Sequence, residues 1–277
     1  MKILVTGATG YIGKQVVSEL VKIPEHTIVV SGRNTQKLKN IADNYNIRKV
    51  EFDLYDKQYN WFEMVGEPDM LIHLAWGGLD NYDSLSHIEQ ELCAHYSFLT
   101  NMIENGLAHL SVVGTCLEYG KQEGCMCEHT PTVPVTSYGV AKDALHQRLR
   151  LLQKNGRFSL KWLRLFYIYG EVSKPGSLLA QVDEAIRRGD TSFNMSGGEQ
   201  LRDYSNIEDV ARNIVDAAFC KSNYRVFNIC SGKPVSARSM VEQQIKKRSS
   251  NMALNLGFYP YLEYEPMAFW GQNSISQ

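Results

Sequence analysis

The residues best suited to proton transfer are Tyr138 and Lys142, in the segment Ser137-Tyr138-Gly139-Val140-Ala141-Lys142. A spacing of four residues on a helix places the phenol and the ammonium on one face. A nearby cation lowers the pKa of a tyrosine from its reference value of about 10, so that the phenol can exchange a proton with a substrate hydroxyl or carbonyl near neutral pH. The pattern predicts an acid/base pair on a helix that runs to about Leu152.

A glycine-rich turn lies near the amino terminus, between a strand pattern and a helix pattern. Glycines permit a tight turn, let backbone N–H groups approach a pyrophosphate and allow close packing of helix on strand, while the helix N-terminus favours the anion. A glycine turn can also serve geometry alone, but its position directly after the first strand favours a dinucleotide site. The predicted cofactor-binding residues of the turn are Gly7, Thr9, Gly10, Tyr11, Ile12 and Gly13.

The end of the second expected strand, Val30-Ser31-Gly32-Arg33, bears on the choice of cofactor. An NAD site usually carries an acidic residue here to bind the ribose 2′-hydroxyl, whereas a guanidinium offers a bidentate partner to a 2′-phosphate. We therefore expect NADP(H), with NAD(H) as the alternative if Arg33 is an exposed loop residue without that role. Asp53, which closes the third strand, either accepts a hydrogen bond from the adenine amino group or caps a turn.

The elements that must position these residues follow an alternating pattern of short apolar runs and longer amphipathic stretches. This alternation is typical of βαβ units and a parallel sheet. We expect an α/β fold with a doubly wound parallel sheet. Residues 1–166 would form a Rossmann domain for NAD(P). Residues 167–277 would form a smaller C-terminal substrate-binding lobe, of which about 204–230 packs back on the Rossmann domain. The expected strands are 3–5, 27–30, 49–52, 70–75, 110–113 and 160–166, and the expected helices include 13–22, 86–105, 177–188 and 208–220.

The composition is that of an ordinary globular protein, with 44% hydrophobic residues, 21% charged residues and a net charge of -1. This charge supplies no field that attracts nucleic acid or an anionic membrane, and no apolar run approaches the ~18 residues that span a bilayer. The amino terminus passes directly into a strand pattern, so we expect a cytoplasmic protein with free thiols. Cys125-Met126-Cys127-Glu128-His129 lacks a second ligand pair at zinc-like spacing, and we expect no metal site.

Further motifs occur in order along nearly the whole chain. They are Thr6 to Gly13, Asp53-Leu54, Ile72-His73-Leu74-Ala75, Gly114 to Gly120, Tyr138 to Lys142, Leu163 to Gly170 and Arg202-Asp203-Tyr204. Together they resemble the extended short-chain dehydrogenase/reductase superfamily, specifically its NAD-dependent epimerase/dehydratase branch of sugar-nucleotide enzymes.

This resemblance implies a role for each matched residue. Tyr138 would be the acid/base, Lys142 would lower its pKa and bind the nicotinamide ribose, and Thr115 would bond the reacting oxygen. The loop from Trp76 to Asn81 would border the cofactor and sugar pocket, and Arg202 would face the substrate diphosphate. The resemblance further implies cofactor contacts from Asp53, Leu54, Leu74, Ala75 and Trp76, and substrate contacts from Trp76, Gly77, Thr115, Cys116, Tyr167 and Arg202.

Departures from the family pattern narrow the expected reaction. Sugar-nucleotide 4,6-dehydratases carry an Asp-Glu pair directly after the threonine, where this chain has Cys116-Leu117, so dehydration is disfavoured. Reductases that also epimerise have a cysteine at the position of Leu117, and we interpret Cys116 as a packed small residue rather than a base. Epimerases that cycle through a 4-keto intermediate usually carry asparagine where Tyr167 stands.

Simple reduction is the reaction that remains. The motifs look most like those of reductases of 4-keto-6-deoxy sugar nucleotides. The resemblance thus implies NADPH-dependent reduction of a C4 ketone for surface polysaccharide synthesis, with dTDP-4-dehydro-6-deoxyglucose as the favoured substrate. Two alternatives stay open: a nucleotide-sugar 4-epimerase that uses NAD, and an NAD(P)-binding scaffold that has lost catalysis. The resemblance also implies a homodimer formed through the helix that carries Tyr138 and Lys142.

Overall fold

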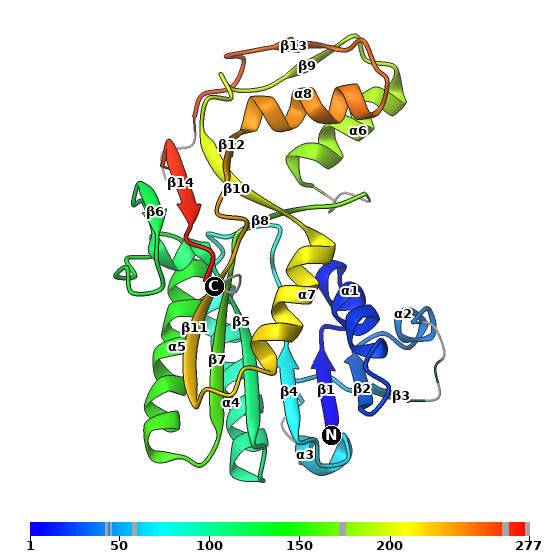
Figure 1. Ribbon diagram of the computed structural model, residues 1–277, viewed down its shortest axis with the longest axis vertical. Coiled ribbons are helices and arrows are strands. Elements are labelled where there is room, and N and C mark those ends of the chain that lie inside the picture. Colours follow the sequence, from blue (N-terminus) through cyan, green and yellow to red (C-terminus); the bar gives the residue numbers. More distant parts are fainter. Residues whose placement is uncertain (42–43, 45, 57–59, 172–175, 262–265, 275–277) are drawn as a thin grey trace.

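The computed structural model describes residues 1–41, 44, 46–56, 60–171, 176–261 and 266–274, and its centre is a seven-stranded sheet. The strands are β1 (Lys2–Thr6), β2 (Thr27–Gly32), β3 (Ile47–Glu51), β4 (Met70–His73), β5 (His109–Thr115), β7 (Ser159–Leu165) and β11 (Tyr224–Ile229). They lie in the order β11-β7-β5-β4-β1-β2-β3, and all neighbours run parallel (Figure 1). The strand order reverses between β1 and β4, where an open parallel sheet leaves a crevice beyond its carboxyl ends.

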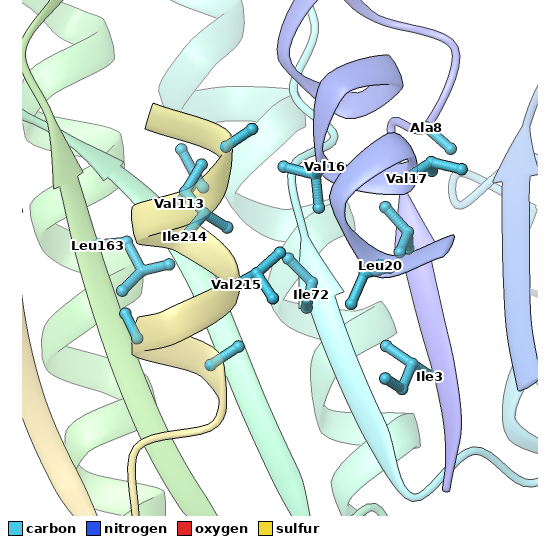
Figure 2. Packing of buried hydrophobic residues seen from close by; sticks show 14 of the residues in the cluster. Ile3, Ala8, Val16, Val17, Leu20, Ile72, Val113, Leu163, Ile214 and Val215 are labelled. Atoms are coloured by element: carbon cyan, nitrogen blue, oxygen red, sulfur yellow. The ribbon is translucent and has the colours of Figure 1, made fainter. Parts of the chain in front are cut away.

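Helices cover both faces of this sheet because strand side chains alternate between the faces. The helices are α1 (Tyr11–Val21), α2 (Thr35–Lys39), α3 (Trp61–Met64), the π-helix η1 (His87–Glu91), α4 (Leu92–Glu104), α5 (Ser137–Asn155) and α7 (Ile207–Ala218). Ile3 belongs to the apolar cluster beneath α1 and α7, and its neighbour Leu4 to the cluster beneath α4 and α5. Figure 2 shows Leu20 of α1 and Val215 of α7 packed over Ile72 of β4. Each such side chain contributes about 1.5–3 kcal/mol by burial.

The C-terminal half adds two smaller sheets. Two elements of the first half lie next to these sheets or in them, the 3-10 helix η2 (Cys116–Tyr119) and β6 (Gly124–Met126). The elements of the C-terminal half itself are β8 (Tyr167–Tyr169), α6 (Leu178–Arg188), β9 (Ser192–Asn194), β10 (Leu201–Asn206), β12 (Pro234–Ser236), α8 (Ala237–Lys247), β13 (Ala253–Asn255) and β14 (Ala268–Gly271). β10 pairs with β8, β12 and β14, and β14 pairs with β6. β9, β13, α6 and α8 gather beyond the carboxyl ends of the central strands, whereas α7 and β11 return to the central sheet (Figure 1).

The expected doubly wound α/β fold is confirmed, with two local differences. The helix expected over 86–105 begins as the π-helix η1 and becomes regular at Leu92. The strand expected over 70–75 ends at His73, because Leu74 and Ala75 leave the sheet and close against Gly7. Within the described ranges, no helix is both long enough and apolar enough to cross a membrane.

Candidate cofactor and active site

The glycine turn forms a cradle at the carboxyl end of β1. Gly7 has φ +69°, a left-handed conformation that glycine adopts without steric cost, and a Cβ there would lie 2.8 Å from the Ala75 nitrogen. Gly10 caps α1 with no side-chain hydrogen bond, and the first turn holds no acidic residue. The first N–H groups of α1 are therefore left to an anionic ligand. Gly13 has no room for a Cβ against the Gly7 carbonyl, which brings α1 close to the strand.

Tyr11 supplies a further sign that this cradle fits a ligand. Its hydroxyl is buried and has no hydrogen-bond partner among the described residues. A Cβ at Gly170 would lie 2.9 Å from that hydroxyl, so the glycine leaves space in front of it. A buried donor without a partner costs free energy that a phosphate oxygen would recover. The cradle and the orphaned hydroxyl fit the pyrophosphate of a nicotinamide dinucleotide.

The ends of β2 and β3 lie beside this cradle. A Cβ at Gly32 would lie 3.3 Å from Cγ2 of Thr9, so the turn and the residue before Arg33 are close neighbours. Arg33 is exposed, and its guanidinium carbon lies 5.8 Å from the centroid of the Tyr55 ring. Oδ1 of Asp53 accepts the Tyr55 N–H at 3.1 Å, which is the turn-capping role considered above. Of the remaining predicted contacts, Leu54 is buried in the apolar cluster beneath α4 and α5, whereas Ile12 and Leu74 pack against the cluster beneath α1 and α7.

Tyr138 lies at the start of α5, where two local features fix it. The Thr136 hydroxyl accepts the Gly139 N–H at 3.1 Å and so begins the helix at Ser137. The Tyr138 N–H donates to the Tyr82 carbonyl at 2.9 Å, which ties the helix to the loop after β4. The Tyr138 side chain is 8% exposed, and its ring stacks on Tyr82 with centroids 5.2 Å apart.

The expected lowering of the Tyr138 pKa was wrong for the protein alone. Burial, reinforced by Tyr82 and Glu118, raises the pKa of Tyr138 well above its usual value. A hydrogen bond with Thr115 acts in the opposite direction but is the smaller effect. Desolvation disfavours a phenolate, and the aromatic rings around Tyr138 come from segments distant in sequence. The phenol therefore stays protonated.

Lys142 is almost fully buried, at 2% exposure. Its Nζ donates to the Val113 carbonyl at 2.9 Å and lies 3.9 Å from the centroid of the Trp76 ring. Nζ is 5.9 Å from the centroid of the Tyr138 ring, so the predicted pair is brought together. Burial lowers the pKa of Lys142 to about 7, although Glu118 and Glu91 favour the charged form.

Thr115 is held by a buried ionic network. Thr115 and Glu118 form a capping box on η2: the Thr115 hydroxyl accepts the Leu117 N–H, and Glu118 accepts the Thr115 N–H at 2.8 Å. Nε of Arg164 donates to Glu118 at 2.7 Å, and Nε1 of Trp162 donates to the same carboxylate. Both charged side chains are buried. The network fixes the threonine that bonds Tyr138.

The predicted substrate residues divide into two groups. Cys116 and Tyr167 line one pocket beside η2, and Cys116 packs in a buried apolar cluster, in keeping with its interpretation as a packed residue. Arg202 lies on β10 with its guanidinium carbon 5.7 Å from the centroid of the Tyr167 ring. Trp76 and Gly77 lie in the loop after β4, and the Trp76 ring meets the Tyr138 ring edge-on with centroids 6.0 Å apart.

One cluster has the composition of a metal site. Glu118, Asp143 and His146 place ligand atoms within 4.8 Å of one another. However, the Arg164 guanidinium already bonds Glu118, and burial together with Arg164 and Arg150 lowers the pKa of His146 to about 3. These positive charges oppose a bound cation, so we assign the cluster no metal.

Several residues around Tyr138 and Lys142 were not predicted from the sequence. Tyr82 stacks on Tyr138 and the His87 ring contacts it at a tilt, while Glu91 and His95 support the Trp76 loop. The Thr115/Glu118 capping box had a recognisable signal, a threonine followed three residues later by glutamate. The other contacts are tertiary and have no local signature.

Known proteins resemble this chain over most of its length. The model of the NAD dependent epimerase/dehydratase family matches residues 3–230. The dTDP-6-deoxy-L-talose 4-dehydrogenase (NAD(+)) of Aggregatibacter actinomycetemcomitans is 32% identical over 275 residues, which cover 98% of this chain and 99% of that protein. The dTDP-4-dehydro-6-deoxyglucose reductase of Escherichia coli is 26% identical over 259 residues, covering 87% of this chain and 79% of that protein.

A solved structure supports the same fold. The UDP-glucuronic acid 4-epimerase from Bacillus cereus, in complex with UDP-glucuronic acid and NAD, matches with a TM-score of 0.85 at 23% identity. The match covers 99% of this chain and 91% of that one. With the family model spanning the strands, the glycine turn and the Tyr138/Lys142 helix, the chain belongs to the NAD dependent epimerase/dehydratase family.

Proposed function

We propose that this protein reduces the C4 ketone of a nucleotide-activated 4-keto-6-deoxy sugar, with a nicotinamide dinucleotide as hydride donor. The observation that carries the proposal is the state of Tyr138, a buried phenol hydrogen-bonded to Thr115 and adjacent to Lys142. Ketone reduction needs a proton donor at the oxygen that becomes negative. Burial keeps Tyr138 in the protonated form that this direction requires.

The side chains divide the work around the reacting carbon. A reduced nicotinamide, when bound, supplies the hydride to C4. Tyr138 donates its phenolic proton to the C4 oxygen, and the Thr115 hydroxyl orients the same oxygen. Lys142 holds the nicotinamide ribose and places positive charge near the developing alkoxide. The aromatic side chains of Trp76 and Tyr82 exclude water from this proton transfer.

The preferred substrate is dTDP-4-dehydro-6-deoxyglucose, in surface polysaccharide synthesis. This choice is supported by the names of the two curated relatives, both of which specify dTDP-activated 6-deoxy sugars. On this chain, Arg202 would bind the diphosphate, since a planar guanidinium suits phosphate oxygens. Cys116 and Tyr167, which lie together beside η2, would contact the sugar.

NADP(H) is the cofactor that we propose. The end of β2 presents Gly32 and the exposed Arg33 next to Thr9, and a guanidinium at this place suits a 2′-phosphate. The relative from Aggregatibacter is named for NAD(+), so NAD(H) is the cofactor to compare with NADP(H) in the assay.

The proposed organisation places the cofactor on residues 1–166 together with 204–230, and the sugar nucleotide between them and the rest of 167–277. We further propose a homodimer formed through α5, on which Val140 and Leu151 are exposed apolar residues.

The six cysteines are free thiols, in keeping with a cytoplasmic location.

A direct assay tests the proposed reaction. Purified protein is mixed with NADPH or NADH and a panel of nucleotide 4-keto-6-deoxy sugars. Oxidation is followed as the loss of the absorbance of the reduced nicotinamide. We expect oxidation that depends on the sugar nucleotide. Absence of oxidation across the whole panel would overturn the proposal.

The second candidate is a 4-epimerase, which UDP-arabinose 4-epimerase 1 of Arabidopsis thaliana supports at 24% identity over 297 residues. This activity predicts NAD that stays bound during purification and inversion at C4 without net change in the cofactor. Mass spectrometry of the denatured protein, with product analysis by NMR, separates it from the reductase.

A further inference from the structure

A chain of buried hydrogen bonds connects the strand beneath the glycine turn to the π-helix η1. Oγ1 of Thr6 is 2.8 Å from Nδ1 of His73, and Nε2 of His73 is 2.7 Å from Nδ1 of His95. Nε2 of His95 is in turn 3.0 Å from Oε2 of Glu91. All four side chains are buried, and none of them belongs to the predicted site.

The charge of Glu91 sets the direction of every bond in this chain. Burial raises the pKa of Glu91, but hydrogen bonds from His95, Tyr55 and the Gly77 N–H outweigh it and hold the pKa at about 2. An ionised carboxylate only accepts hydrogen bonds, so His95 donates from Nε2 and accepts at Nδ1. His73 then donates from Nε2 and accepts the Thr6 hydroxyl at Nδ1. Burial lowers the pKa of both histidines, so both rings are neutral.

The same carboxylate fixes the loop that carries Trp76. The Gly77 N–H donates to Oε2 of Glu91 at 2.9 Å, and a Cβ at Gly77 would lie 2.5 Å from Oε1. The His95 ring stacks on Trp76, with centroids 4.5 Å apart and planes 15° apart. Nε1 of Trp76 donates to Nδ1 of His87 at 3.1 Å. Glu91 therefore holds Trp76 in two ways: it binds the backbone of the next residue, Gly77, and it binds His95, whose ring stacks on the indole.

Trp76 is the side chain in contact with the Lys142 ammonium, 3.9 Å from its ring centroid. We propose that Glu91 is a positioning residue that, through Gly77 and His95, holds Trp76 against Lys142 and so couples the Tyr138/Lys142 pair to the strand beneath the cofactor turn. The proposal deepens the proposed function, on which it rests for the role of Lys142. Its physical basis is that the face of an indole stabilises a desolvated ammonium.

The charge state of Lys142 is the observable on which the test depends. The ionisable groups that act on its ammonium are Glu118 and Glu91, which favour the charged form, whereas the neighbouring His73 and His95 are neutral. The experiment uses protein labelled with ¹³C at lysine Cε, without substrate or cofactor, and follows the Lys142 resonance by NMR as pH changes. Loss of that resonance in Lys142→Met identifies it. The expected midpoint of the native protein is about 7.

Glu91→Gln replaces the carboxylate by a neutral amide, whose single oxygen makes weaker hydrogen bonds to the Gly77 N–H and the His95 ring and therefore holds the Trp76 loop less firmly. We expect the Lys142 midpoint to fall by about one pH unit, a change of about 1.4 kcal/mol. Glu89→Gln is the matched control, because Glu89 is an exposed acid on the same π-helix, and we expect no shift from it. An unchanged midpoint in Glu91→Gln, or an equal shift in both variants, would overturn the proposal.

A second variant separates positioning from direct charge interaction. Trp76→Phe keeps an aromatic ring but weakens the contact with the ammonium, so the midpoint should fall by several tenths of a pH unit. If Glu91 acts through Trp76, the double variant should show less than the sum of the single shifts. If the shift of the Lys142 midpoint in the double variant equals the sum of the two single shifts, the proposal that Glu91 acts through Trp76 is overturned. If Glu91→Gln alone does not fold, an unshifted midpoint in Trp76→Phe overturns the proposal and a lowered one supports it. Because no substrate is present, this result is independent of the reductase assay.

Discussion

Replacing Lys142 by methionine should stabilise the protein while it abolishes the proposed activity. Burial lowers the pKa of Lys142 from 10.5 to about 7, which means that the folded state disfavours the ammonium. In the unfolded chain the same side chain is hydrated and fully protonated at neutral pH. Folding of the native protein at pH 7 therefore carries a cost that methionine, a side chain of similar length, does not have.

The size of this effect follows from the contacts of Nζ. The difference between 10.5 and about 7 corresponds to roughly 4–5 kcal/mol at about 1.4 kcal/mol per pH unit. Losing the hydrogen bond to the Val113 carbonyl costs about 1 kcal/mol, and losing the contact with Trp76 costs about 2 kcal/mol. A net stabilisation of about 1–2 kcal/mol remains. At about 2–4 °C per kcal/mol, Tm should rise by about 2–8 °C.

The pH dependence provides the sharper part of this prediction. Between pH 7 and 10.5 the unfolded lysine binds a proton that the folded one has lost, so native stability gains from Lys142 as pH rises through this window. Lys142→Met should lack that gain. Differential scanning calorimetry at pH 6 to 10 measures both, with Lys154→Met, an exposed lysine on α5, as control. A lower Tm for Lys142→Met at pH 7, or an unchanged pH dependence relative to the native protein, would refute the reasoning.

Four further variants test other parts of the site. Tyr138→Phe removes the proton donor, so kcat should fall by about 10²–10⁴-fold with cofactor affinity nearly unchanged; unchanged biological activity would favour a scaffold. Arg33→Ala should raise the KM for NADPH by about tenfold and leave the KM for NADH nearly constant, since only NADPH carries the 2′-phosphate; equal changes in steady-state assays would contradict this. Glu118→Gln leaves the buried Arg164 without its counter-charge and should cost about 3–5 kcal/mol in urea unfolding; a loss below about 1 kcal/mol would contradict the ionic network. Gly7→Ala places a Cβ 2.8 Å from the Ala75 nitrogen and should weaken dinucleotide binding by about tenfold or more in calorimetric titration; native affinity would show that the turn does not bind the cofactor.

The central sheet could be predicted because its strands are short, apolar and separated by amphipathic stretches, a pattern that survives in the sequence alone. Met70 to His73 illustrates both the success and its limit. The apolar run continues through Ala75, but the strand stops earlier because Ala75 packs against Gly7 from a distant segment. The π-helix η1 could not be predicted either, since Glu91 at its end bonds Tyr55 and Gly77, which come from other segments and which no local pattern specifies.

The candidate site shows the same division between local pattern and tertiary environment. The spacing of Tyr138 and Lys142 correctly indicated that their side chains lie near each other. The direction of the Tyr138 pKa was wrong because it depends on burial under Tyr82 and Trp76, which a spacing argument omits. In a buried pair of this kind, the protonation state of each side chain depends more on desolvation by the surrounding residues than on the other member of the pair.

The most direct test of the central claim follows the hydride itself. The protein is incubated with nicotinamide cofactor deuterated at C4 of the reduced ring and with dTDP-4-dehydro-6-deoxyglucose, and both products are analysed by mass spectrometry and NMR. The account predicts one oxidised nicotinamide per sugar reduced and deuterium at C4 of the sugar, with both lost in Tyr138→Phe. The absence of oxidised nicotinamide, or a sugar inverted at C4 without net oxidation of the cofactor, would contradict the proposed reduction.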